Sequence, residues 1–317
     1  RPTDHHELKE STVTPVITVK NLRKTYGAKV AVDDVSFEVR RGEIFGILGP
    51  NGAGKTTSVE CLTGLRAADD GEIRVLGLDP AHDGAALRER VGVQLQEGEL
   101  HPKIRVREAL ELFASFYPDP ADGVALATRL GLAEKLDAQY RHLSGGQKQR
   151  LAVALALIGK PEIAVLDELT TGLDPQARRE VWELVESVRE EGVTIVLVTH
   201  FMDEAERLCD RIAVIDAGRV VATDTPAGLA VGARRGQVMR FRTDGDGARV
   251  TALLEGLDSV EEARVDRGEI VVRGREDVVV DVVLALAEAG VRPVDVEVAR
   301  TSLEDAFVQL TRSHEEV

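Results

Sequence analysis

The chain has 317 residues, of which 43% are hydrophobic and 30% charged, a composition typical of a globular protein with one large or two medium domains. Its formal net charge of −15 argues against nucleic acid as a partner, because nucleic-acid-binding surfaces are basic. No run approaches the roughly 18 to 20 apolar residues of a membrane span, and the sequence does not open on a secretory signal. The only two cysteines, Cys61 and Cys209, lack metal-ligand spacing, which predicts free thiols in a cytosolic setting.

The first 14 residues are polar and aperiodic, which predicts a loose leader. Alternating apolar residues at 16–19 and 31–39 then predict two antiparallel strands, with Tyr26 in the turn between them.

A glycine-rich segment follows the apolar run 43–48 and leads into a predicted helix at 56–63; it reads Gly49, Pro50, Asn51, Gly52, Ala53, Gly54, Lys55, Thr56 and Thr57. Glycines let successive backbone N–H groups turn toward an anion, and the helix start adds its positive dipole end. Lys55 is placed to reach the β- and γ-phosphates, and the Thr56 hydroxyl to bind Mg²⁺. The segment therefore predicts a nucleoside triphosphate site; an ordinary strand–helix turn is the weaker alternative.

A strand at 91–96 ends in Gln96, whose amide could reach Mg²⁺ or water. The apolar spacing then becomes helical from 106 to about 139 and predicts an inserted helical subdomain. Ser144 is a predicted helix N-cap, with Gln147 completing a capping box. Residues Leu143–Gln147 thus form a second glycine-rich helix start. Because one chain does not readily bend both loops around one triphosphate, two copies facing head to tail are the natural geometry.

The continuous apolar strand 163–166 runs into Asp167 and Glu168. Asp167 can hold Mg²⁺, through water in many such sites, and Glu168 can orient an attacking water. Alone, the pair could be a solvated strand end; beside the Lys55 loop, the functional interpretation is favoured. His200 follows the strand 194–199, at the sheet edge where ligands of open α/β sheets bind.

Helices at 176–191 and 202–208, with strands at 193–198, 212–215 and 220–222, complete a doubly wound core. The small, basic stretch 232–236 predicts a domain boundary. The tail then alternates as βαββαβ plus one helix, which favours a small ferredoxin-like domain.

The order of these motifs resembles the ATP-binding subunits of ATP-binding-cassette (ABC) transporters over Val16 to Thr225: Tyr26, Gly49–Thr57 (Walker A), Gln96 (Q-loop), Leu143–Gln147 (signature), Ile163–Glu168 (Walker B), Gly172–Asp174 (D-loop) and His200 (switch). The resemblance implies an α/β P-loop NTPase cassette with a mixed sheet core, an antiparallel β subdomain and a helical subdomain at about 97–158. The implied domains are a leader at 1–14, a cassette at 15–231 and an accessory domain at 237–317.

The resemblance also implies a role for each motif. Tyr26 would stack on adenine, the Gly49–Thr57 loop would hold the phosphates of ATP, and Thr56, Gln96 and Asp167 would bind Mg²⁺. Glu168, His200 and Gln96 would carry catalysis. Ser144, Gly145, Gly146 and Gln147 would complete the nucleotide site of a second subunit in a homodimer or a pair of cassettes, with Asp174 at the dimer seam.

The tail at 237–312 resembles the C-terminal extension of daunorubicin-resistance type (ABC-2) exporter ATPases. This implies ATP-driven export of a drug-like or lipid-like substrate through a separate ABC-2 permease, with the chain at the cytoplasmic face of the membrane. An importer ATPase and a soluble ABC ATPase without a transport role stay open. The tail could equally be a packing appendage or a regulatory domain.

One position departs from the family pattern. Leu169 follows Glu168 where the family usually has proline. Proline would fix φ and restrict Glu168, so we expect its replacement to loosen this turn only modestly.

Overall fold

The computed structural model describes residues 14–94, 100–233, 237–243, 247–266, 268–275, 277–300 and 303–312. The predicted leader up to residue 13, and Gln96, therefore lie outside the described residues. The chain divides into two compact units, Arg1–Thr223 and Asp224–Val317. The segment 224–231, which the sequence suggested was the end of the cassette, is grouped with the second unit.

The first unit is built on a nine-stranded sheet in the order β4-β1-β2-β9-β8-β3-β7-β6-β5. Its strands are β1 (Pro15–Tyr26), β2 (Lys29–Arg40), β3 (Ile44–Leu48), β4 (Asp70–Val75), β5 (Val91–Gln94), β6 (Ile163–Asp167), β7 (Thr194–Thr199), β8 (Arg211–Asp216) and β9 (Arg219–Asp224). Strands β4, β1 and β2 pair antiparallel, whereas β8, β3, β7, β6 and β5 run parallel. The predicted mixed sheet with an antiparallel part is confirmed.

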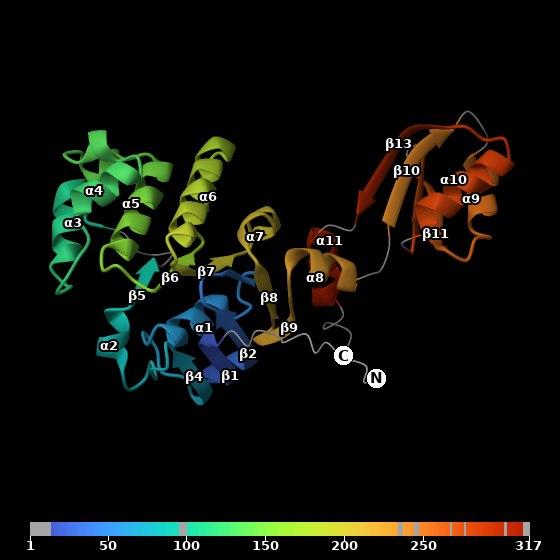
Figure 1. Cartoon of the computed structure of the whole chain (residues 1–317). Helices are drawn as coiled ribbons and strands as arrows, with labels where there is room; N and C mark the ends of the chain where they lie inside the picture. The colour runs from blue at the N-terminus through green and yellow to red at the C-terminus, as the bar shows by residue number, and fades with distance from the viewer. Residues whose placement is uncertain are drawn as a thin grey trace, which may run out of the picture. The chain divides into compact units, whose positions relative to one another are not determined.

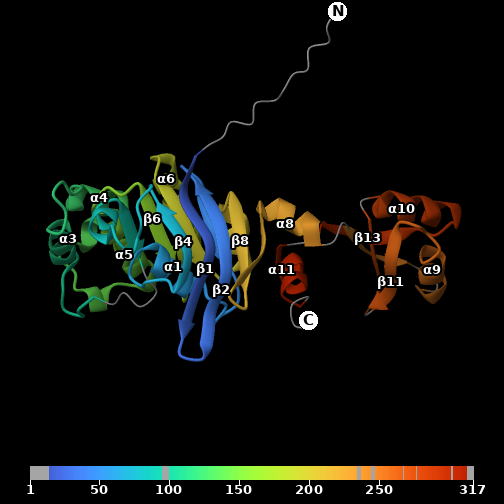
Figure 2. The same cartoon turned by 90° about the horizontal axis from the view of Figure 1, so that it is seen from below.

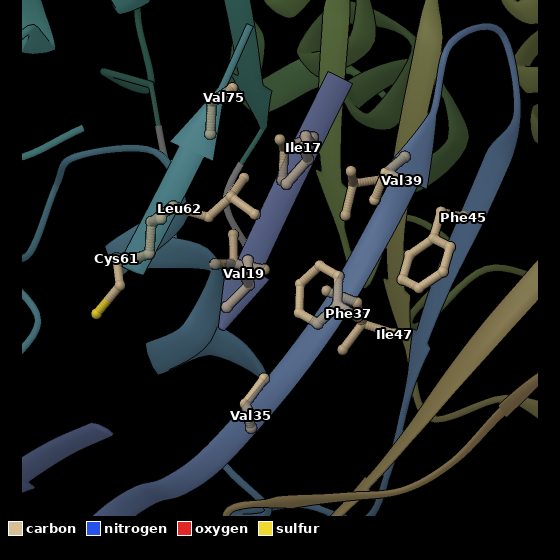
Figure 3. Close-up of a cluster of buried hydrophobic side chains, with 14 of the residues drawn as sticks. Ile17, Val19, Val35, Phe37, Val39, Phe45, Ile47, Cys61, Leu62 and Val75 are labelled. Carbon is tan, nitrogen blue, oxygen red and sulfur yellow. The ribbon is translucent and has the colours of Figure 1, made fainter. Parts of the chain in front are cut away.

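The antiparallel and parallel strands share one apolar core, closed by helix α1 (Lys55–Leu62) (Figure 3). The rings of Phe37 on β2 and Phe45 on β3 stack with their centroids 5.3 Å apart. Strands β3, β6 and β7 are buried along their whole length, as expected of central strands covered on both faces. The sheet therefore holds the carboxyl ends of these three strands at fixed positions on one edge.

Three longer helices of the inserted subdomain gather beyond β5: α3 (Val106–Ala114), α4 (Gly123–Arg129) and α5 (Gly145–Leu157) (Figure 1). Two short 3₁₀ turns, Ala133–Lys135 and Tyr140–His142, complete this subdomain, and helix α2 (Gly84–Arg88) precedes β5 in the chain. Helix α5 lies so close to β5 that a Cβ at Gly92 would fall 1.9 Å from the Ala156 carbonyl oxygen. Helices α6 (Pro175–Glu190) and α7 (Met202–Leu208) lie on either side of β7 in sequence and carry the turns that reach the site.

The second unit holds a four-stranded antiparallel sheet in the order β11-β12-β10-β13. Figure 2 labels its strands β11 and β13 and its helices α9 and α10. Its elements are α8 (Pro226–Ala233), β10 (Gln237–Thr243), α9 (Gly247–Leu254), β11 (Val260–Asp266), β12 (Glu269–Gly274), α10 (Val278–Glu288), β13 (Pro293–Arg300) and α11 (Leu303–Arg312). A βαββαβ chain with this strand order is the ferredoxin-like arrangement, so that prediction is confirmed. Its core includes Met239 and Phe241 against Val282 and Leu286, and α11 returns to pack on α8.

Within the part of the chain that the structure describes, no helix is both long enough and apolar enough to span a bilayer.

Candidate nucleotide-binding site

The glycine-rich loop joins β3 to α1, and two of its glycines are required by the backbone around them. A Cβ at Gly49 would fall 2.2 Å from the Ile215 carbonyl oxygen. Gly54, the N-cap of α1, has φ +103°, and a Cβ there would fall 2.5 Å from the Ala31 carbonyl oxygen. Because glycine has no side chain to cap α1, the N–H groups of the first turn are left to an incoming ligand.

Lys55 is the first residue of α1 and lies folded over the loop. Its Nζ donates to the carbonyl oxygens of Gly49, at 2.8 Å, and Pro50, at 3.0 Å. The residue is only 5% exposed. Burial lowers the pKa of Lys55, and the carboxylates of Glu168 and Asp167 act in the opposite direction. The ammonium therefore lies next to both acidic residues of the site and can turn from the loop carbonyls to a phosphate.

Asp167, the last residue of β6, lies fully buried beside the loop. Thr56 Oγ1 donates to Asp167 Oδ2 at 3.4 Å, and the Asp167 backbone N–H donates to Gln94 Oε1 at 3.1 Å. Burial, and then the Glu168 charge, raise the pKa of Asp167 to about 6. Among the described residues Asp167 Oδ1 has no hydrogen-bond partner. A buried acceptor without a donor, next to a threonine hydroxyl, fits a hard cation such as Mg²⁺ or its bound water.

Glu168 and His200 meet at the adjoining edge. His200 Nδ1 lies 3.1 Å from Glu168 Oε1, with the Glu168 side chain only 9% exposed. Glu168 takes an unusual φ of +51°, and its backbone N–H donates to the Val198 carbonyl at 2.8 Å. The Thr171 hydroxyl donates to Glu168 Oε2 at 3.4 Å. This left-handed backbone turns the carboxylate from the strand end toward the imidazole.

The second glycine-rich start begins α5, and its predicted capping box is present. The Gln147 N–H donates to Ser144 Oγ at 3.3 Å, and the Ser144 N–H donates to Gln147 Oε1 at 3.0 Å. A Cβ at Gly145 would lie 3.2 Å from Leu173 Cδ2, and one at Gly146 would lie 3.3 Å from Ala177 Cβ. The first turn of α5 therefore packs on the turn that starts α6.

Two further predicted residues, Asp174 and Tyr26, contact other groups. Asp174 caps α6, its Oδ1 accepting from the N–H groups of Gln176 and Ala177 at 3.0 Å. Tyr26 is 41% exposed, with the Arg66 guanidinium 5.1 Å from its ring centre.

The structure thus brings Lys55, Thr56, Asp167, Glu168 and His200 together. The side chains of Ser144 and Gln147 bond instead to each other's backbone N–H groups. Sequence reasoning named Gln96 and missed Gln94; a polar residue ending an otherwise apolar strand was the available signal. The fold and this edge define a phosphate-loop nucleotide-binding protein.

Comparison with known proteins places that class more narrowly. The family model described as "ABC transporter" matches residues 32–171. The chain is 48% identical over 219 residues to Nod factor export ATP-binding protein I of Ralstonia nicotianae (strain ATCC BAA-1114 / GMI1000), covering 67% of this chain and 68% of that one. It is 39% identical over 303 residues to daunorubicin resistance ATP-binding protein DrrA3 of Streptomyces coeruleorubidus, covering 93% and 95%.

A solved structure titled "Structure of ATP binding subunit of ABC transporter" superposes with a TM-score of 0.62 at 29% identity, covering 68% of this chain and 92% of that one. The chain belongs to the ATP-binding proteins of the ABC transporter family, which bind and hydrolyse ATP and work with transmembrane permeases. The resemblance noted from the motifs is confirmed.

Proposed function

We propose that this chain is the ATP-hydrolysing subunit that powers export of a drug-like or lipid-like substrate through a separate ABC-2 type permease, at the cytoplasmic face of the membrane. Two of its relatives are named for export or drug resistance. The likeness to DrrA3 spans 93% of the chain and so extends into the ferredoxin-like unit as well as the cassette.

The observation that carries the catalytic part is the pairing of Glu168 with His200 beside the Lys55 loop. The N–H groups of the loop and the Lys55 ammonium bind the phosphates of ATP. Thr56 and Asp167, with Gln96 outside the described residues, would hold Mg²⁺, which would neutralise charge at the phosphates when bound. Glu168 orients the attacking water, and the His200 imidazole donates to the γ-phosphate.

We further propose that the working form is a homodimer, facing head to tail. Ser144 Oγ accepts from the Gln147 N–H, so its own proton is free to donate to a γ-phosphate oxygen bound by a second copy. Gly145 and Gly146 let the start of α5 approach that phosphate closely. Asp174, which caps the adjacent α6, would lie at the seam. Nucleotide would then favour the closed dimer, because it contacts both subunits only in that state.

Glu168→Gln tests this function. Removing the water-orienting carboxylate should lower ATP turnover on the order of 100-fold or more while leaving ATP bound. The variant should therefore accumulate as a dimer with Mg-ATP in size-exclusion chromatography. Lys55→Ala, which removes the phosphate contact, should stay monomeric under the same conditions.

Wild-type turnover in Glu168→Gln would contradict the assignment of Glu168. For the dimer, mixtures of Lys55→Ala and Ser144→Ala subunits should regain one intact site. Mixtures as inactive as either variant alone would contradict a shared site in which each half acts independently. ATP-dependent substrate uptake into inverted vesicles that carry the co-purified permease would support export. ATP-dependent uptake only into right-side-out vesicles would support the importer alternative.

A further inference from the structure

A second polar cluster is buried behind the catalytic edge, around Glu204 of α7. Glu204 is fully buried, and burial raises the pKa of its carboxyl. Its Oε1 accepts a hydrogen bond from Trp182 Nε1 on α6 at 3.2 Å. Burying a carboxylate costs free energy that a leucine of similar size would not. Filling the same space with an apolar side chain would therefore cost less free energy than Glu204 does.

Two threonines from the catalytic segments face this carboxylate. Thr170, two residues after Glu168, and Thr199, directly before His200, are both fully buried. Their hydroxyls favour the charged form of Glu204 and oppose the effect of burial on its pKa. Thr199 Oγ1 accepts from the Phe201 N–H at 3.0 Å, so its proton can point to the carboxylate.

The bond from Trp182 is the fixed contact of this carboxylate. Among the described residues Glu204 Oε2 and Thr170 Oγ1 are buried without a hydrogen-bond partner. The carboxylate thus has one fixed donor on α6 and an oxygen that can tighten onto a threonine when the catalytic turns move.

Helix α6 is tied to the histidine segment at a second point. Arg178, one turn before Trp182, bonds Asp203 Oδ2 at 2.9 Å, and its guanidinium lies 4.8 Å from the Phe201 ring centre. That ring lies 4.1 Å from the His200 ring, centre to centre. Since Asp174 caps α6 and the start of α6 touches the start of α5, this helix connects the histidine segment to the proposed dimer seam.

We propose that Glu204 is a positioning residue: it holds the Thr170 turn and the Thr199–His200 segment in register, so that Glu168 and His200 are presented to the γ-phosphate together and α6 follows their movement. The inference rests on the proposed roles of Glu168 and His200. Glu204 itself touches no substrate. Its effect is on the chemical step and on closure, and ATP binding to the Lys55 loop does not depend on it.

Glu204→Gln is the decisive variant, because it keeps the shape and the acceptor for Trp182 while replacing the second acceptor oxygen with a donor. Trp182 is the only tryptophan of the chain, so its fluorescence reports directly on this cluster. Mg-ATP should change Trp182 emission in the wild type. In Glu204→Gln, ATP affinity should stay within about twofold, kcat should fall about tenfold, and the emission change should be lost.

Val188→Ala, further along the buried face of α6, is the control for simple loss of stability. It should lower the melting temperature. Its kcat and its Trp182 emission change on adding Mg-ATP should both stay close to those of the wild type. Thr170→Val, which removes only a hydroxyl, should lower kcat several-fold at unchanged ATP affinity and serves where Glu204→Gln fails to fold.

The inference is overturned if wild-type emission does not respond to Mg-ATP. It is also overturned if both Glu204→Gln and Thr170→Val keep the wild-type kcat, or if both keep the emission change. A third contrary result is a Glu204→Gln variant that loses no more kcat than a Val188→Ala variant of equal melting temperature. Failure of the proposed function looks different: there Glu168→Gln itself keeps wild-type turnover.

Discussion

Helices α1 and α5 both start at glycine-rich turns, yet only α5 has a side chain that caps its first N–H groups. The N-cap of α1 is Gly54, which offers no side chain, and the neighbouring Lys55 bonds to carbonyls of its own loop. The N-cap of α5 is Ser144, which closes a capping box with Gln147. The first helix start leaves its N–H donors for a ligand, whereas the second has already satisfied part of its own.

Their glycines differ in the same way. At α1, Gly54 has φ +103° and backbone oxygen within 2.5 Å of a would-be Cβ. At α5, the nearest atoms to a Cβ at Gly145 and at Gly146 are Leu173 Cδ2 at 3.2 Å, which can rotate away, and Ala177 Cβ at 3.3 Å, which is fixed to the α6 backbone. The first loop is shaped by backbone carbonyls of other segments, those of Ile215 and Ala31. The start of α5 packs instead on the start of α6, and we expect it to act on a ligand held by a second copy. This contrast is what a shared site between two copies requires.

Gly54→Ala gives the largest expected effect. A Cβ meets the Ala31 carbonyl at a backbone that already favours glycine, so we expect ATP affinity of the single subunit to fall by up to about 100-fold. Gly146→Ala should instead keep ATP affinity within about twofold and lower turnover, because its Cβ meets Ala177 at the start of α6 and displaces the start of α5, not the phosphate loop. Titration calorimetry with Mg-ATP, beside steady-state ATPase assays, separates the two.

Gly192→Ala is the matched control for the backbone alone: its φ is +92°, and nothing lies within 4 Å of a Cβ there. It should cost stability without affecting ATP affinity. If Gly54→Ala binds ATP as the wild type does, the loop is less constrained than its neighbours indicate. If Gly146→Ala loses ATP binding as a monomer, the two helix starts are not divided between copies.

Ser144→Ala gives a smaller effect and tests the α5 side chain. It removes the hydroxyl that caps the helix and that we expect to donate to the γ-phosphate, so turnover should fall on the order of tenfold. The cap itself is worth about 1 kcal/mol of stability. ATP affinity of the single subunit should not change.

Asp122→Ala removes the equivalent cap of α4, where Asp122 Oδ1 accepts from the N–H groups of Val124 and Ala125. It should cost similar stability with unchanged turnover in the coupled ATPase assay. Equal turnover losses in the two variants would reduce Ser144 to a helix cap.

Local patterns were enough to predict much of this site. The phosphate loop, the Asp167–Glu168 strand end and the Ser144 cap are each written in fewer than about ten consecutive residues, with bonding that is local in sequence. The ferredoxin-like tail was readable from its alternation of strands and helices, because its connections are short.

What could not be predicted depends on segments that meet only in the fold. Gln94 reaches Asp167 across 73 positions, and Trp182 reaches Glu204 across 22. Neither pair has a spacing that marks it. The predicted cassette ends at residue 231, because nothing in the segment of α8 indicates that α11, at the other end of the tail, packs against it.

Leu169→Pro gives the smallest expected effect and asks how Glu168 keeps its place without the proline usual in this family. Glu168 has φ +51°, and a following proline would restrict its backbone. Its position does not rest on that angle alone: Val198 holds its N–H, and His200 and Thr171 hold its carboxylate. ATP turnover should therefore change by no more than several-fold.

Leu169 is fully buried, so the same substitution should also lower the free energy of unfolding by about 1 to 3 kcal/mol through lost packing. The melting temperature should fall accordingly. Leu169→Val removes similar volume without fixing φ and is the control for that loss. Turnover in Leu169→Pro that falls as far as in Glu168→Gln, with Leu169→Val unaffected, would mean that the turn and not the three contacts positions the carboxylate. A loss shared by both variants would place the effect in packing, and a large gain in Leu169→Pro would mean that this chain holds Glu168 away from its best position.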